Sequence, residues 1–240
     1  MPQAKPLYSA LLFDVFGTVV DWKGSITREL SDYADTHSLP PLDWQQFALD
    51  WRALYQPAME KIRSGDRGYV RLDTLHRENL LALLPKYGLT NLADEQIDHI
   101  NQVWHRLQPW PDCLPGMYRL RRHYILASLS NGNIALMVNM ARHSSIPWDA
   151  ILGSEPTRGY KPQPQVYLKS AEMLGLTPEQ CLMVAAHNDD LRAAAELGFA
   201  TAYINRPYEY GAAQSVDFQA DEEWTFVSDS MTGLATLLGC

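Results

Sequence analysis

The sequence is poor in cysteine and has no long apolar run. Its three cysteines, Cys113, Cys181 and Cys240, are widely spaced and odd in number, so they imply neither a disulfide framework nor a zinc motif. Free thiols are typical of a reducing cytosol, and residues 1–10 contain no apolar run long enough for a signal peptide, so we expect a cytoplasmic protein. No stretch approaches the roughly 20 apolar residues of a membrane span, so we expect no membrane partner.

Basic charge is also scarce. The formal net charge is -8, which disfavours a nucleic-acid partner because binding to phosphates requires a basic face. Hydrophobic residues make up 46% of the 240 residues, enough to bury a sizeable core. This length and composition indicate one large α/β domain, or a core domain with a smaller insertion.

The chain begins with one strand and continues with a helical block. The short apolar run Tyr8–Val15 predicts a buried strand, and Gly17 a tight turn after it. From Ser25 to about Arg106, apolar residues recur at helical spacing, and no β-branched strand is evident. Two prolines around Trp110 then indicate a hinge or domain boundary.

Helices and strands alternate in the remainder of the chain. The pattern predicts helices over 117–123, 133–143, 163–174 and 191–197, and strands over 124–129, 150–152, 181–185 and 200–204. This rhythm is typical of a doubly wound parallel α/β sheet, with helices on both faces. We expect a Rossmann-like core of residues 1–22 and 110–240, with a helical cap of residues 23–109 inserted after the first strand.

Polar residues follow several of the predicted strands. Asp14, Ser130, Asn131 and His187 should meet at one cleft, because ligands bind beyond the carboxyl ends of parallel strands. A carboxylate such as Asp14 can attack carbon or phosphorus without first losing a proton at pH 7. Considered alone, Asp14 is more simply interpreted as a cap of the following turn.

Four segments together change that interpretation. In chain order they are Asp14-x-x-Gly17-Thr18, Ser130-Asn131-Gly132, Tyr160-Lys161-Pro162 and Ala185-Ala186-His187-Asn188-Asp189-Asp190. In these segments the chain resembles the haloacid dehalogenase superfamily over nearly its whole length. The resemblance implies a Rossmann-like core, a cap domain and an aspartate nucleophile at Asp14.

Two positions separate the phosphatases of this superfamily from its dehalogenases. Phosphatases carry a second aspartate two residues after the nucleophile, where this chain has Phe16, and a metal-binding aspartate where it has Ala186. The absence of both aspartates argues against phosphoryl transfer assisted by a metal. The chain is more similar to the type II L-2-haloacid dehalogenases, which have an aromatic residue at position 16, a Ser-Asn-Gly segment and no metal or other cofactor.

This resemblance implies a hydrolase that converts short 2-haloalkanoic acids, such as haloacetates and L-2-halopropionate, into 2-hydroxy acids with water. It assigns catalysis to Asp14, Thr18, Arg52, Lys161 and Asp190, with Arg52 accepting the halide. It assigns substrate or halide binding to Val15, Phe16, Ser130, Asn131, Tyr167 and His187. A homodimer is suggested only by analogy with the family.

One segment departs from the family pattern. The dehalogenases usually have Ser-Ser-Asn before the aspartate of this segment, whereas this chain has Ala185, Ala186 and His187, with Asn188 one place later. The serine and asparagine of the family help to place the hydrolytic water. Because a histidine can act as a base near pH 7, His187 could take over part of that work.

Other interpretations stay open at this point. Arg52 could face solvent, Lys161 could be a loop charge, Asn131-Gly132 a turn, Tyr167 a core residue and His187 a loop residue without a role. The aspartates at 189 and 190 could hold a residual cation or begin a helix. The alternative functions are a magnesium-dependent phosphatase or phosphonatase of the same superfamily and a non-catalytic binding protein with this fold.

Overall fold

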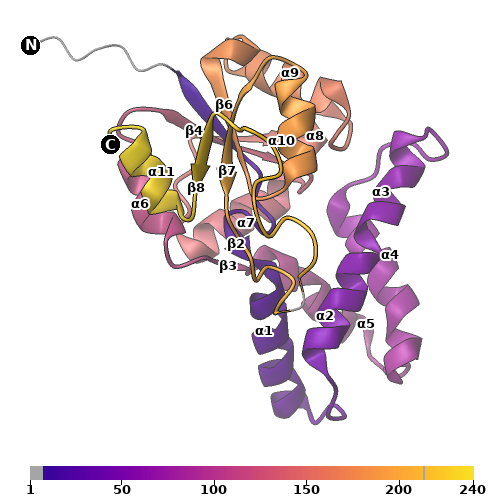
Figure 1. Ribbon diagram of the computed structural model, residues 1–240. Coiled ribbons are helices and arrows are strands. Elements are labelled where there is room, and N and C mark those ends of the chain that lie inside the picture. Colours follow the sequence, from indigo (N-terminus) through magenta and orange to yellow (C-terminus); the bar gives the residue numbers. More distant parts are fainter. Residues whose placement is uncertain (1–7, 213) are drawn as a thin grey trace, which may run out of the picture.

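A parallel sheet of six strands forms the centre of the molecule (Figure 1). The computed structural model describes residues 8–212 and 214–240. Residues 1–7 and 213 of the predicted core therefore lie outside the described residues, as does most of the segment 1–10 that we expect not to be a signal peptide. The strand order is β5-β4-β1-β6-β7-β8, and every neighbouring pair is parallel. The strands are β1 (Ala10–Phe13), β4 (Ile125–Ser130), β5 (Ala150–Gly153), β6 (Cys181–Ala185), β7 (Ala200–Ile204) and β8 (Phe226–Ser228). The predicted doubly wound α/β fold is confirmed.

Helices cover both faces of this sheet. On one face, α6 (Cys113–Leu120), α7 (Ile134–Ser144) and α11 (Met231–Leu237) pack against Leu11 and Phe13 of β1. On the other, α9 (Pro164–Met173) and α10 (Asn188–Ala195) pack against Ala10 and Leu12. Successive side chains of a strand point to opposite faces, so a strand buried on both faces is apolar throughout. The short elements α8 (Ser154–Thr157) and η3 (Pro178–Gln180) complete the core.

A group of helices follows the first strand and lies at one end of the sheet (Figure 1). They are α1 (Trp22–His37), α2 (Trp44–Ala53), α3 (Tyr55–Arg63), α4 (Leu72–Leu83), η1 (Leu84–Tyr87), α5 (Asp94–Asn101) and η2 (Gln102–His105). A small antiparallel pair, β2 (Val20–Asp21) and β3 (Gln108–Pro109), joins the two ends of this insertion. We refer to this helical insertion as the cap; its predicted limits, 23 and 109, stay a prediction.

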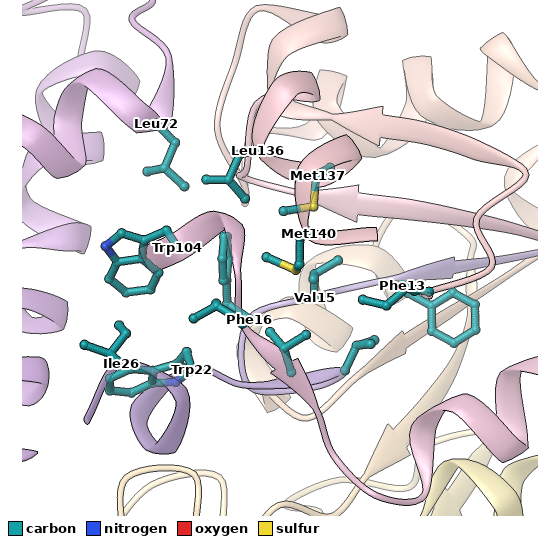
Figure 2. Packing of buried hydrophobic residues seen from close by; sticks show 14 of the residues in the cluster. Phe13, Val15, Phe16, Trp22, Ile26, Leu72, Trp104, Leu136, Met137 and Met140 are labelled. Carbon is teal, nitrogen blue, oxygen red and sulfur yellow. The ribbon is translucent and has the colours of Figure 1, made fainter. Parts of the chain in front are cut away.

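The cap and the sheet domain share one hydrophobic cluster. Phe16, which follows the first strand, packs edge-on against Trp104 of η2 at 5.8 Å between ring centroids. Trp22 at the start of α1 stacks on the same indole at 6.4 Å. Figure 2 shows these rings in one cluster with Leu72 of the cap and with Met137 and Met140 of α7. Aromatic burial of this kind contributes to the stability of both parts at once.

Within residues 8–212 and 214–240, no helix has the length and apolar character needed to cross a membrane.

Candidate active site

Asp14 lies at the carboxyl end of a central strand. β1 is hydrogen-bonded to β4 on one side and to β6 on the other, and the Asp14 N–H donates to Val184 O at 2.9 Å. The chain then turns through Gly17, whose φ of 89° lies in the left-handed region that favours glycine. The Asp14 side chain is 9% exposed, so its carboxylate lies in a largely dehydrated site.

Three donors surround the Asp14 carboxylate. Lys161 Nζ lies 2.9 Å from Oδ1, the Thr18 hydroxyl donates to Oδ2 at 2.6 Å, and His187 Nδ1 lies 3.2 Å from Oδ2. Burial would raise the pKa of Asp14, but Lys161 and then His187 outweigh it and hold that pKa well below its ordinary value. Asp14 is therefore ionised at neutral pH, as a carboxylate nucleophile must be.

Lys161 joins Asp14 to a second carboxylate. Its Nζ lies 2.5 Å from Asp190 Oδ2, and the Tyr167 hydroxyl donates to Asp190 Oδ1 at 2.5 Å. Burial, followed by the charge of Asp14, raises the pKa of Asp190 although Lys161 opposes the shift. The backbone N–H of Lys161 donates to Asn131 Oδ1 at 2.9 Å, so the Ser-Asn-Gly turn fixes the loop that carries the lysine.

A cavity of about 410 Å³ opens above Asp14, within the size range of small-molecule sites. Its walls come from the sheet domain and from the cap: Asp14, Phe16, Arg52, Tyr55, Gln56, Arg63, Asn131, Lys161, Pro162, Tyr167, His187, Asp189, Asp190, Tyr210 and Asp217. Eight of the residues proposed from the sequence meet here: Asp14, Phe16, Arg52, Asn131, Lys161, Tyr167, His187 and Asp190.

Arg52 brings positive charge from helix α2 of the cap. Its guanidinium carbon lies 4.0 Å from the centroid of the Tyr55 ring. Its Nη1 atom is buried and has no hydrogen-bond partner among the residues that the structure describes. A buried donor without a partner, on the wall of a cavity, is suited to bind an anion.

Three of the proposed residues do not line the cavity. Thr18 is fully buried behind Asp14 and acts on it through the hydrogen bond to Oδ2. Val15 is also fully buried, so only its backbone could serve a ligand. Ser130 is fully buried and its Oγ accepts a hydrogen bond from the Gly132 N–H at 3.0 Å. Through this hydrogen bond Ser130 stabilises the turn that presents Asn131, and the proposed contact between Ser130 and substrate stays a prediction.

In the segment that departs from the family pattern, the side chains point in three different directions. His187 faces Asp14, whereas the Asn188 amide donates to Asp217 Oδ1 at 2.9 Å and holds the loop after β7. Asp189 is 96% exposed and pairs with Arg192, while Asp190 is 10% exposed and faces Lys161. The two aspartates therefore do not point into one cation site. Within the described ranges, no group of three or more His, Cys, Asp or Glu side chains is arranged to hold a metal ion.

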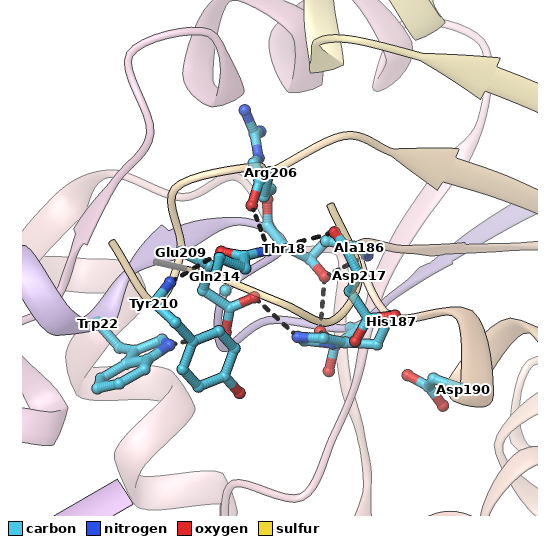
Figure 3. A network of polar contacts seen from close by, with 12 residues as sticks. Thr18, Trp22, Ala186, His187, Asp190, Arg206, Glu209, Tyr210, Gln214 and Asp217 are labelled. Atoms are coloured by element: carbon cyan, nitrogen blue, oxygen red, sulfur yellow. Dashed lines mark hydrogen bonds and ion pairs between the residues drawn. The ribbon is translucent and has the colours of Figure 1, made fainter. Parts of the chain in front are cut away.

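Glu209 is a member of the site that the sequence analysis missed. Its Oε2 lies 2.9 Å from His187 Nε2, and its Oε1 accepts a hydrogen bond from the Trp22 indole N–H at 2.8 Å (Figure 3). Glu209 lies in the long loop between β7 and β8, and no motif surrounds it. Only the folding of that loop back over the end of β1 brings the side chain to His187.

His187 is enclosed by two carboxylates. Burial opposes the charged ring, but Glu209 and Asp14 outweigh it and hold the pKa of His187 well above its ordinary value. A folded-state pKa that is raised above the unfolded value gives stability that is fully present below about pH 6.5. That stability is lost as the pH rises through the folded-state value.

We therefore expect His187→Asn to destabilise the protein most at low pH. The gap in unfolding free energy between wild type and variant should shrink as the pH rises from about 6.5 through the raised folded-state pKa of His187, because the wild-type ring then loses its proton. Urea unfolding at several pH values measures the gap. His123→Asn, at an exposed position, is the matched control and should show no such trend. A gap that widens with pH would contradict a charged His187.

Comparison with known proteins agrees with this geometry. A family model described as haloacid dehalogenase-like hydrolase matches residues 8–198. A solved structure of a defluorinating L-2-haloacid dehalogenase is 46% identical, covering 97% of this chain and 96% of its own, with a TM-score of 0.94. A second solved L-2-haloacid dehalogenase is 43% identical, covering 96% of this chain and 99% of its own, with a TM-score of 0.91. The (S)-2-haloacid dehalogenase 4A of Burkholderia cepacia is 25% identical over 234 residues, which is 94% of this chain and 97% of the relative.

Proposed function

Because the chain belongs to the haloacid dehalogenase-like hydrolase family, we propose that it hydrolyses the carbon–halide bond of short 2-haloalkanoic acids. The observation that carries the proposal is an ionised Asp14 at the base of a cavity, with Phe16 and Ala186 where phosphatases of the superfamily need aspartates. The relatives named L-2-haloacid dehalogenase support the same substrate class.

In the first step, an oxygen of Asp14 attacks C2 of the substrate and the halide leaves in line with its bonding pair. The backbone N–H groups of Val15 and Phe16, at the start of the turn after β1, hold the substrate carboxylate. Arg52 and Asn131 receive the halide, since a developing anion in a dehydrated cavity is stabilised by fixed donors. The product of this step is an ester between Asp14 and the organic acid.

In the second step, water attacks the carbonyl carbon of that ester. Lys161, Thr18 and Asp190 orient the groups around Asp14, and Tyr167 holds Asp190. The cap covers the cavity and limits the access of bulk water during the first step. Inversion at C2 of an L-2-haloacid gives the D-2-hydroxy acid.

We expect halide release from chloroacetate, bromoacetate, fluoroacetate and L-2-chloropropionate to persist with EDTA present. The positive charge next to Asp14 comes from Lys161 at 2.9 Å, so no metal is required to hold the carboxylate. Halide measurement with and without EDTA tests this. A strict Mg²⁺ requirement, or phosphate release from p-nitrophenyl phosphate at a higher rate than halide release, would replace the proposal by a phosphatase.

We also propose a cellular location and an oligomeric state. Cys113, Cys181 and Cys240 are free thiols, which suit a reducing compartment, and we place the protein in the cytoplasm. A homodimer is proposed by analogy with the family, and size-exclusion chromatography tests it.

A further inference from the structure

We propose that Glu209 and His187 form a general-base pair that clears the Asp14 ester, with Glu209 as the positioning residue for His187. The inference rests on the proposed dehalogenase function and assigns its second half-reaction. It gives a role to the segment that lacks the serine and asparagine of the family.

The contacts form a continuous line from the cap to the nucleophile. Trp22 of α1 donates to Glu209 Oε1 at 2.8 Å, Glu209 Oε2 lies 2.9 Å from His187 Nε2, and His187 Nδ1 lies 3.2 Å from Asp14 Oδ2 (Figure 3). Each imidazole nitrogen thus has one carboxylate partner. A ring held at both nitrogens cannot turn away from Asp14 without losing both contacts.

Glu209 is buried at a position where Gly17, which has no side chain, leaves room for its carboxylate. Its side chain is 1% exposed, and both carboxylate oxygens are engaged, by Trp22 and by His187. A Cβ atom at Gly17 would lie 2.2 Å from Glu209 Oε1, so the turn after the nucleophile must be a glycine for the carboxylate to approach. A buried carboxylate is costly unless it is paired, and Glu209 meets this requirement through His187.

Ester formation changes the charge that His187 meets. Before the reaction, Asp14 and Glu209 both stabilise the charged ring. Alkylation of Asp14 removes one of these charges and leaves only Glu209, on the Nε2 side. Lys161 Nζ lies on the other carboxylate oxygen of Asp14, Asp190 pairs with Lys161, and Arg52, Tyr210 and Asp217 line the same cavity. Nδ1 then loses the carboxylate it contacts, so its proton passes to solvent water in the cavity and a free lone pair faces the ester.

Water, His187 and the Asp14 ester account for every bond and proton that changes in the hydrolysis step. The water oxygen bonds to Asp14 Cγ while one water proton passes to His187 Nδ1. Collapse of the tetrahedral intermediate breaks the bond between Cγ and the alkoxide oxygen, which takes the proton from Nδ1. The products are the 2-hydroxy acid and a protonated Asp14 carboxyl, which releases its proton to solvent. Glu209 stabilises the imidazolium through Nε2–H and fixes its tautomer.

Rapid-quench measurements on Glu209→Gln test the proposal. With L-2-chloropropionate, chloride formation should stay within about threefold of wild type, whereas ester hydrolysis should slow about 100-fold or more, the usual contribution of a general base. Mass spectrometry should then find the ester accumulated on Asp14. Glu172→Gln, the same change at an exposed position of α9, is the matched control and should keep both steps unchanged.

A purely structural role predicts a different pattern. If chloride formation and ester hydrolysis fall alike, or if neither changes, the proposal is overturned. The pH profile of ester hydrolysis adds a second readout: the wild-type rate should rise and then level off, and His187→Asn should remove the plateau. If Glu209→Gln does not fold, the His187→Asn profile decides by itself. Absence of chloride release from wild type would reject the dehalogenase function instead.

Discussion

Replacing Asp14 by Asn is expected to abolish halide release, with a loss on the order of 10⁶-fold, as when the nucleophile is removed from a serine protease. An amide lone pair is delocalised and cannot form the ester, although Asn has nearly the same shape as Asp. Chloride release from L-2-chloropropionate measures the effect. Lys161 and His187 each lose one anionic partner in this variant, so its stability can change. A melting curve therefore serves as the control that the variant is folded.

Isotope labelling distinguishes this mechanism from direct attack by water. In a single turnover of the wild type in ¹⁸O-water, the oxygen added to the product comes from Asp14, which then acquires the label. The first product should therefore contain no label, and one labelled oxygen should remain on Asp14. Label in the first product would mean that water attacks C2 directly and that Asp14 is not a nucleophile.

Replacing Lys161 by Met is expected to cost both stability and activity. Lys161 Nζ lies between two buried carboxylates, 2.9 Å from Asp14 and 2.5 Å from Asp190. Removing one member of a buried ion pair typically costs about 3–5 kcal/mol, because the other charge stays buried without compensation. Activity should fall by about 100-fold or more, because Asp14 then ionises less readily. Urea unfolding and chloride release are the measurements.

The stability that Lys161→Met loses depends on pH. Lys161 and His187 keep the folded-state pKa of Asp14 low, which gives stability above the ordinary aspartate value that is lost as the pH falls through the folded-state value. The stability gap between wild type and Lys161→Met should therefore be large at pH 7 and should narrow in acid. Adding Asp190→Asn should recover part of the stability but not the activity, and recovery of activity would contradict a direct role for Lys161.

Much of the fold could be predicted because parallel strands buried on both faces are apolar runs. The strands at 181–185 and 200–204 have the predicted limits. The helix predicted from Leu191 begins at Asn188 instead, because its first turn is the polar segment that faces the site. Strands β2, β3 and β8 were not predicted, since two or three residues are too few to show a period.

Some residues of the candidate site could be predicted from the sequence and others could not. Asp14 could be proposed because it follows a recognisable strand, and Lys161 and Asp190 because their segments resemble those of the superfamily. Ser130 is fully buried at the end of β4, and the direction of a side chain at a strand end depends on the pleat, so its expected contact with substrate stays a prediction.

Local sequence determined the nucleophile and the chemistry open to it: an acid after a buried strand, a glycine turn, and Phe16 in place of a second acid. Tertiary structure alone decided what faces His187. Glu209 and Trp22 are 187 residues apart and meet only because the loop after β7 folds back over the end of β1. A motif records neighbours in the chain, whereas charge compensation in a buried site depends on neighbours in space.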